Sequence, residues 1–158
     1  MIFSALYEKP ISFPSPDGES MIQYNIKVLF ENSHAKIWTI DRFITDEECR
    51  VLERHAKPLL KRATVAAEDG SSIVSENRKA QQAGYDLHQN NPFDPLVPLF
   101  SRVLGVTNTV AGYHLTPEGQ EDFTVIQYNP QDQYSPHCDG DCNSNPHNPG
   151  GRVATAVS

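Results

Sequence analysis

The sequence predicts an α+β fold in which helices pack on one side of a mostly antiparallel sheet. A strand-like segment is followed by two helix-like segments and then by further strand-like segments, an order that is typical of this class. The chain has 158 residues, the length of one ordinary domain. Its 38% hydrophobic and 9% aromatic residues are enough for a packed core, which argues against a disordered chain.

The N-terminal part is expected to be irregular. Several prolines and Gly18 interrupt residues 1–34, and we interpret this stretch as a leader in which only MIQYNIKVLF, residues 21–30, has a strand-like composition. Residues 35–158 are expected to form the domain proper. Its first strand should lie in AKIWTIDRFI, residues 35–44, because this segment is rich in β-branched and aromatic residues.

A helix should follow this strand at once. Thr45 and Glu48 have the spacing of a capping box, which predicts a helix start, and Pro58 predicts where the helix ends. Cys49 belongs to the apolar stripe of this helix, so its thiol is expected to be buried in the core.

The second half of the chain predicts one more helix and then strands. Residues 64–93 are polar and predict loops. A helix should begin with Asp94 ahead of a proline and end at Gly105. FTVIQY, residues 123–128, predicts a strand, the following NPQDQ a turn, and GGRVATAVS, residues 150–158, a further strand.

The charge distribution narrows the classes of partner. The formal net charge of −7 argues against nucleic acid. From Val103 to Gly151 there is no Lys or Arg but there are several Asp and Glu residues, so this part attracts cations or forms a solvated acidic surface. No run of about 18 apolar residues is present, so the sequence encodes no membrane span. The N-terminus also lacks the charged and apolar regions of a signal peptide.

The cysteines leave two interpretations open. The chain has three of them, and an odd number argues against a full disulfide framework. Cys138 and Cys142 could form a local disulfide or remain free thiols. Together with His137 and His147 they also have a spacing that zinc sites use. In an extended segment, however, Cys138 points away from the face that carries His137, which argues against zinc.

His137 and Asp139 are the strongest candidates for metal ligands. They are separated by one residue, so in an extended segment both side chains lie on the same face. An imidazole and a carboxylate are two of the three protein ligands in the facial triad that holds non-haem Fe(II). The same spacing also occurs in surface turns, so the surrounding sequence has to show whether this pair belongs to a metal site or to a turn. Pro136 stiffens the approach to the pair, which follows the strand predicted at residues 123–128.

The surrounding segment, FTVIQYNPQDQYSPHCDGD…GGRVATAVS, resembles the core of the prolyl 4-hydroxylase type of Fe(II)/2-oxoglutarate-dependent dioxygenases. The family pattern is a strand ending in Tyr, a Gly-containing turn, Tyr-x-x-His-x-Asp, and Arg-x-x-Thr on the following strand. Upstream, IDRFITDEECRVLERHAKPLL resembles the opening strand and helix of the family. SSIVSENRKAQQ resembles its Ser- and Arg-containing loop, and DPLVPLFSRVLGV resembles the helix before the catalytic strands. The resemblance thus extends in order over residues 37–158.

The resemblance implies a double-stranded β-helix, or jelly-roll, dioxygenase core with the N-terminal helices packed on its sheet. It implies that His137 and Asp139 are Fe(II) ligands and that Tyr128 helps to bind the carboxylate of 2-oxoglutarate. The residues that match the peptide-substrate groove are Tyr134, Arg152 and Arg78.

The activity implied by the resemblance is the hydroxylation of peptidyl proline, coupled to the decarboxylation of 2-oxoglutarate to succinate. The cofactors and co-substrates would be Fe(II), 2-oxoglutarate and O₂, with ascorbate as reductant. The partner would be a proline-containing peptide or protein, and the compartment favoured by the resemblance is the endoplasmic reticulum. The oligomeric state and the particular substrate are not specified by the sequence.

The chain departs from the family pattern at two places. The turn has Gln131 and Asp132 where the family has Gly and Gln. The distal His ligand of the family, and the Lys or Arg that pairs with the far carboxylate of 2-oxoglutarate, would lie downstream of Ser158. We therefore expect a C-terminally truncated, incomplete jelly-roll that is inactive as this chain alone. His147 could supply the third ligand only from a position that the family does not use.

Two alternative functions follow from these departures. The first is a truncated, non-catalytic fragment that folds in part and binds metal weakly. The second is a small zinc-binding interaction module built on Cys138, Cys142 and His147.

Overall fold

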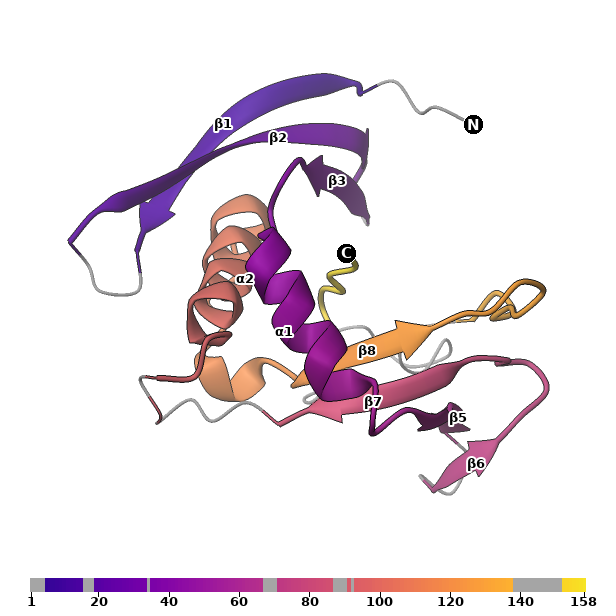
Figure 1. Ribbon diagram of the computed structural model, residues 1–158. Helices are drawn as coiled ribbons and strands as arrows, with labels where there is room; N and C mark the ends of the chain where they lie inside the picture. Colours follow the sequence, from indigo (N-terminus) through magenta and orange to yellow (C-terminus); the bar gives the residue numbers. More distant parts are fainter. Residues whose placement is uncertain are drawn as a thin grey trace. The chain divides into compact units, whose positions relative to one another are not determined.

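The computed structural model describes residues 5–15, 19–33, 35–66, 71–86, 91, 93–137 and 152–158. Along the chain, strands β1 to β3 come first, then helix α1, strands β4 to β7, helix α2 and strand β8 (Figure 1). They belong to two compact units, one made of Met1–Glu48 and His88–Glu121 and the other of Cys49–Leu87 and Asp122–Ser158. Helix α1 (Asp46–Ala56) has its first turn in the first unit and continues into the second.

An antiparallel sheet with the order β1-β2-β3 forms the first unit, from β1 (Tyr7–Pro14), β2 (Met21–Glu31) and β3 (Lys36–Ile40). Strand β3 confirms the strand expected in residues 35–44. Strand β2 confirms the strand-like composition of residues 21–30. The irregular structure expected for the rest of residues 1–34 is wrong for Tyr7–Pro14, which form β1. The prolines of β1 are tolerated because β1 lies at the edge of the sheet, where a missing N–H interrupts no inner ladder.

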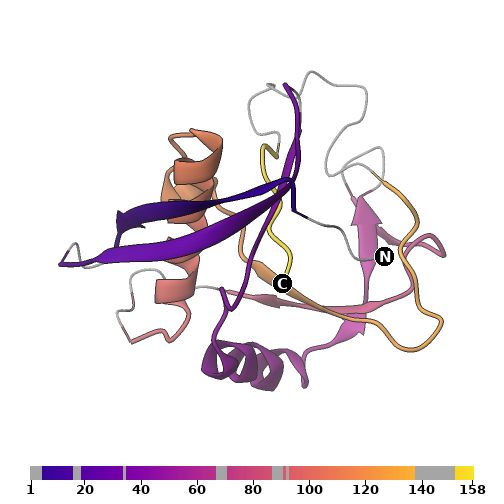
Figure 2. The ribbon, with the colours of Figure 1, turned by 90° about the horizontal axis from the view of Figure 1, so that it is seen from above.

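Helix α2 (Val97–Ala111) packs against β1 in the same unit (Figures 1 and 2). The predicted end at Gly105 is wrong. The helix ends instead at Gly112, which adopts the left-handed conformation with φ 72° and donates its N–H to Asn108 O. Gly105 has a different role, since a Cβ atom there would lie 2.6 Å from Cδ2 of Phe13. The buried residues that join sheet and helix are Ile11, Phe13, Ile26, Val28, Val106 and Val110.

Helix α1 begins with the predicted capping box. Thr45 N and Thr45 Oγ1 each donate to Glu48 Oε2 at 2.9 Å, and Glu48 N donates to Thr45 Oγ1 at 3.2 Å. The prediction that Cys49 is buried is wrong, because its thiol is exposed. The inward side of the helix carries Glu48, Leu52 and Ala56, four residues apart, and Cys49 lies about 100° from this line.

The second unit contains a sheet with the order β4-β7-β8 and a separate hairpin. The sheet consists of β4 (Lys61–Arg62), β7 (Gln81–Tyr85) and β8 (Phe123–Gln127), all antiparallel. The hairpin pairs β5 (Thr64–Ala66) with β6 (Ser72–Val74). Strand β8 confirms the strand expected in residues 123–128, whereas residues 64–93 are not all loop. A short 3-10 helix, η1 (Pro117–Gly119), lies between α2 and β8 in the sequence.

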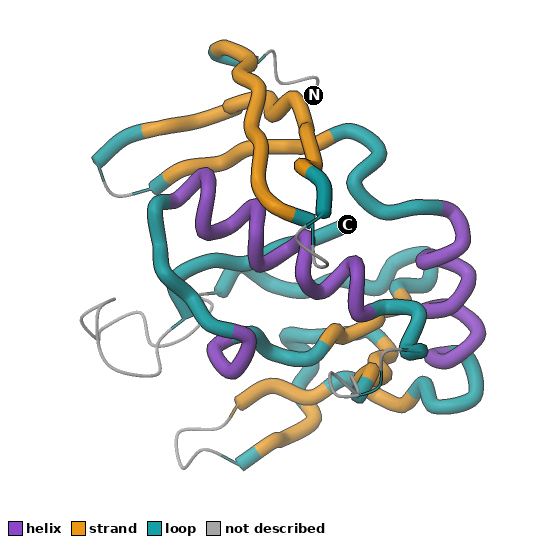
Figure 3. Tube along the Cα trace, turned by 90° about the vertical axis from the view of Figure 1, so that its left-hand side faces the viewer, coloured by secondary structure: helices purple, strands orange, loops and turns teal. Residues whose placement is uncertain are grey.

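Residues 152–158 form a loop, so the strand expected in residues 150–158 is wrong for its described part (Figure 3). Its β-branched residues favour a strand only where a neighbouring strand pairs with them. The fold is therefore mixed, with small antiparallel sheets and α2 on one of them. The described residues show no jelly-roll, and that core stays a prediction. In the part of the chain that the structure describes, no helix has the length and apolarity needed to cross a membrane.

Candidate functional site

The segment with the predicted metal ligand follows β8 through a tight turn. Asp132 N donates to Asn129 O at 2.9 Å, and the Asp132 carboxylate accepts from Asn129 N at 2.8 Å. This confirms the turn predicted from NPQDQ. Gln131 has φ 76°, a left-handed conformation that glycine adopts with least strain.

Beyond the turn, the chain pairs with the residues that precede β7. Lys79 N donates to Gln133 O at 2.8 Å and Ser135 N donates to Asn77 O at 2.9 Å. These bonds flank an antiparallel bridge between Arg78 and Tyr134, which is therefore a non-hydrogen-bonded pair. Side chains of such a pair lie on the same face and close together.

Three of the predicted site residues meet in one stack, formed by Arg78, Tyr134 and His137. Cζ of Arg78 lies 4.8 Å from the centroid of the Tyr134 ring. The rings of Tyr134 and His137 are nearly parallel, with an interplanar angle of 20° and centroids 3.6 Å apart. The guanidinium of Arg78 is also anchored by a hydrogen bond, because its Nη1 donates to Thr64 O at 3.0 Å.

The orientation of His137 suits a metal ligand. Its Nδ1 lies 2.9 Å from Ser135 O. A carbonyl oxygen only accepts, so Nδ1 carries a proton, and in the neutral imidazole the lone pair then lies on Nε2. Many metal-binding histidines have the same arrangement, with one ring nitrogen donating to a carbonyl and the other bound to the metal. The exposed imidazole thus has the chemistry that an Fe(II) ligand requires.

The remaining predicted residues are not part of this stack. Tyr128 follows β8 directly and its side chain is exposed. Arg152 is also exposed, and the strand on which it was expected is a loop. Within the described ranges, no three His, Cys, Asp or Glu side chains gather as a metal-binding group. The candidate ligands that lie outside the described residues are Asp139, Cys138, Cys142 and His147.

Comparisons with known proteins supply no relative. No family model, no curated protein and no solved structure matches the chain. A function for the chain is therefore supported by the chemistry of its residues and by the resemblance of their pattern.

Two backbone contacts that hold the stack were not predicted. Thr64 and Asn77 contribute carbonyl oxygens, to the guanidinium of Arg78 and to Ser135 N. Every residue type carries such a carbonyl, so no pattern of side chains could have pointed to these positions.

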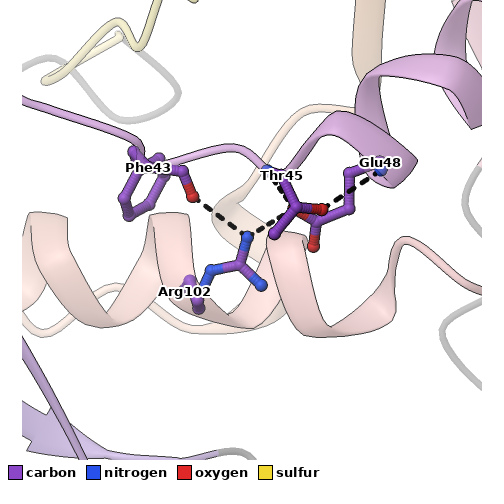
Figure 4. Close-up of polar contacts among 4 residues, drawn as sticks. All are labelled: Phe43, Thr45, Glu48 and Arg102. Carbon is purple, nitrogen blue, oxygen red and sulfur yellow. Dashed lines mark hydrogen bonds and ion pairs between the residues drawn. The ribbon is translucent and has the colours of Figure 1, made fainter.

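The sequence also missed a buried ion pair in the first unit (Figure 4). Nη2 of Arg102 lies 2.7 Å from Glu48 Oε2 and donates to Phe43 O at 3.2 Å. The Arg102 and Glu48 side chains are only 12% and 11% exposed. Burial alone would raise the pKa of Glu48, but the hydrogen bonds from Arg102 and Thr45 outweigh it and hold that pKa below its usual range. This pair stabilises the start of α1 and lies outside the candidate metal site.

Proposed function

We propose that this chain carries part of the site of an Fe(II)/2-oxoglutarate-dependent dioxygenase that hydroxylates peptidyl proline, with the third metal ligand not among the residues predicted here. One observation carries the proposal. The family resemblance selects Arg78, Tyr134 and His137 from two separate segments, and these three side chains stack on one another. Chance similarity of short motifs gives no reason for residues from separate segments to be in contact.

The turn before the stack adds support. The family has a glycine where this chain has Gln131, and the backbone here takes the conformation that glycine favours. Gln131 thus departs from the pattern in residue type, while its backbone takes a conformation that glycine adopts with least strain.

The residues divide the work as follows. Nε2 of His137 and the carboxylate of Asp139 would hold Fe(II), and the Tyr128 hydroxyl would donate a hydrogen bond to a 2-oxoglutarate carboxylate. The bound metal supplies the oxidising chemistry, with O₂ and 2-oxoglutarate as co-substrates and ascorbate as the reductant that keeps it ferrous. The residues that would line the groove for the peptide substrate are Tyr134, Arg152 and Arg78.

Binding of Fe(II) together with 2-oxoglutarate tests this proposal. Without oxygen, we expect a visible charge-transfer absorption that requires both components. His137→Ala should abolish it, because it removes a metal ligand, whereas His114→Ala should retain it, because His114 is an exposed imidazole in the other unit. Tyr128→Phe should retain the band but require about tenfold more 2-oxoglutarate, the effect of losing one hydrogen bond to a charged group.

Two results would contradict the proposal and would distinguish its alternatives. Zinc affinity that falls in Cys142→Ser but not in His137→Ala would indicate a zinc-binding interaction module. Weak binding of Fe(II) and Zn(II), without a charge-transfer absorption when 2-oxoglutarate is added, would indicate a non-catalytic fragment.

A further inference from the structure

We infer that Arg78 and Tyr134 are positioning residues for His137, which hold its imidazole in the orientation that binds a divalent metal before the metal arrives. This role differs from that of lining a peptide groove, which the resemblance implies for both residues. The part of the inference that concerns the metal rests on the proposed function, and the orientation of the imidazole does not.

The first step is the register between the two segments. The hydrogen bonds from Lys79 N to Gln133 O and from Ser135 N to Asn77 O lie on either side of the bridge between Arg78 and Tyr134. A slip of one residue would turn one side chain of the pair to the opposite face. The backbone therefore places the guanidinium beside the phenol ring.

The second step is the fixed position of the guanidinium. Nη1 of Arg78 donates to Thr64 O in β5, and Cζ lies over the Tyr134 ring. Nε of Arg78 is buried and has no hydrogen-bond partner among the described residues. The interactions that hold this side chain thus come from the β5 backbone and from the aromatic ring, as suits a supporting residue.

The third step is the restraint on His137. The nearly parallel ring of Tyr134 limits rotation of the imidazole, and the contact of Nδ1 with Ser135 O selects which nitrogen carries the lone pair. A ligand that is already oriented loses less rotational freedom when it binds a metal. The contact with His137 involves the Tyr134 ring. We therefore expect phenylalanine at this position to keep the orientation of the imidazole and leucine to lose it.

NMR spectra of the metal-free protein test the orientation. The ring current of Tyr134 should shift the His137 ring protons upfield, with the signals assigned from His137→Gln. Tyr134→Leu should return them to the position of an unstacked histidine, Tyr134→Phe should preserve the shift, and Arg78→Gln should reduce it. Tyr113→Leu and Arg62→Gln are matched controls, since both residues are exposed and lie outside the stack.

Mn(II) affinity, measured by calorimetry on the same variants, tests the consequence. Tyr134→Leu and Arg78→Gln should each bind about tenfold more weakly, the effect typical of losing a residue that orients a metal ligand. Tyr134→Phe should remain within about twofold of the wild type. Circular dichroism checks that each variant is folded, and Arg78→Gln carries the test if Tyr134→Leu unfolds.

The outcomes separate this inference from the proposed function. An unshifted His137 in the wild type would overturn the inference, and His137→Ala would still decide the proposed function. If the wild type shows the ring-current shift, but Arg78→Gln and Tyr134→Leu bind Mn(II) as tightly as the wild type, the positioning role alone is overturned. A wild-type chain that shows the shift but binds no Mn(II) would overturn both.

Discussion

Replacing Glu48 by glutamine should lower the free energy of unfolding by about 3 kcal/mol, because it leaves the buried charge of Arg102 without its partner. The side-chain carbonyl of glutamine can still accept from Thr45, so the capping box survives and the loss reports the ion pair. Urea unfolding followed by Trp38 fluorescence measures the effect. This single tryptophan belongs to the first unit and packs against its core.

The matched control is Glu53→Gln, an exposed position on the same helix, which should change stability by less than about 0.5 kcal/mol. The pH dependence gives a second check. The pKa of Glu48 is lowered in the folded protein, so its contribution is present above its unfolded value of 4.5 and is lost as pH falls through the folded value. The difference between wild type and Glu48→Gln should therefore be constant above about pH 5.5 and shrink below pH 4.5. Equal stabilities at pH 7 would contradict the structural role of the pair.

Gly105→Ala should destabilise the protein by about 1–3 kcal/mol, although alanine is the better helix former by about 1 kcal/mol. The added Cβ would lie 2.6 Å from Cδ2 and 2.9 Å from Cε2 of Phe13. Phe13 is buried between α2 and the sheet, so its ring has little room to move. The cost of overpacking should thus exceed the gain in helix propensity. Urea unfolding of the variant measures the net effect.

Gly119→Ala is the matched control, because a Cβ there meets nothing within 4 Å. It should be neutral to within about 0.5 kcal/mol. Phe13→Leu should recover part of the loss in the background of Gly105→Ala, since a smaller side chain makes room for the methyl group. A stabilising Gly105→Ala would show that helix propensity, and not contact with Phe13, decides at this position.

Local features of the fold could be predicted from the sequence. The capping box of Thr45 and Glu48 depends on neighbouring residues only, and so does the turn between Asn129 and Asp132. Strands β3 and β8 have compositions that favour strands in most surroundings. In each case the structure depends on residues that are close in the sequence.

Features set by distant contacts could not be predicted. Gly105 resembles a helix end, but the approach of Phe13 explains it better, and no local pattern contains that contact. The inward position of Glu48, which leaves Cys49 exposed, depends on Arg102, 54 residues away in the chain. Strand β1 was missed because its prolines are compatible with a strand only at a sheet edge, and a sequence does not state which strand will be the edge.

In the candidate site, too, local features could be predicted from the sequence and contacts between distant residues could not. The spacing of His137 and Asp139 and the motif around them could be read directly, because strand geometry links spacing to face. The contact of Arg78 with Tyr134 depends on the pairing of two separate segments. Only the family resemblance brought these residues into one site before the structure placed them together. Asp139 lies outside the described residues, so its position beside His137 stays a prediction.

Mn(II) binding to His137→Ala, Asp139→Ala and the double variant tests the central claim most directly. Two ligands of one ion act as a unit, so each single variant should lose at least about 100-fold in affinity and the double variant little more. His114→Ala, the exposed control, should bind like the wild type. If Asp139→Ala also binds like the wild type, Asp139 is not a ligand and the proposed Fe(II) site is wrong.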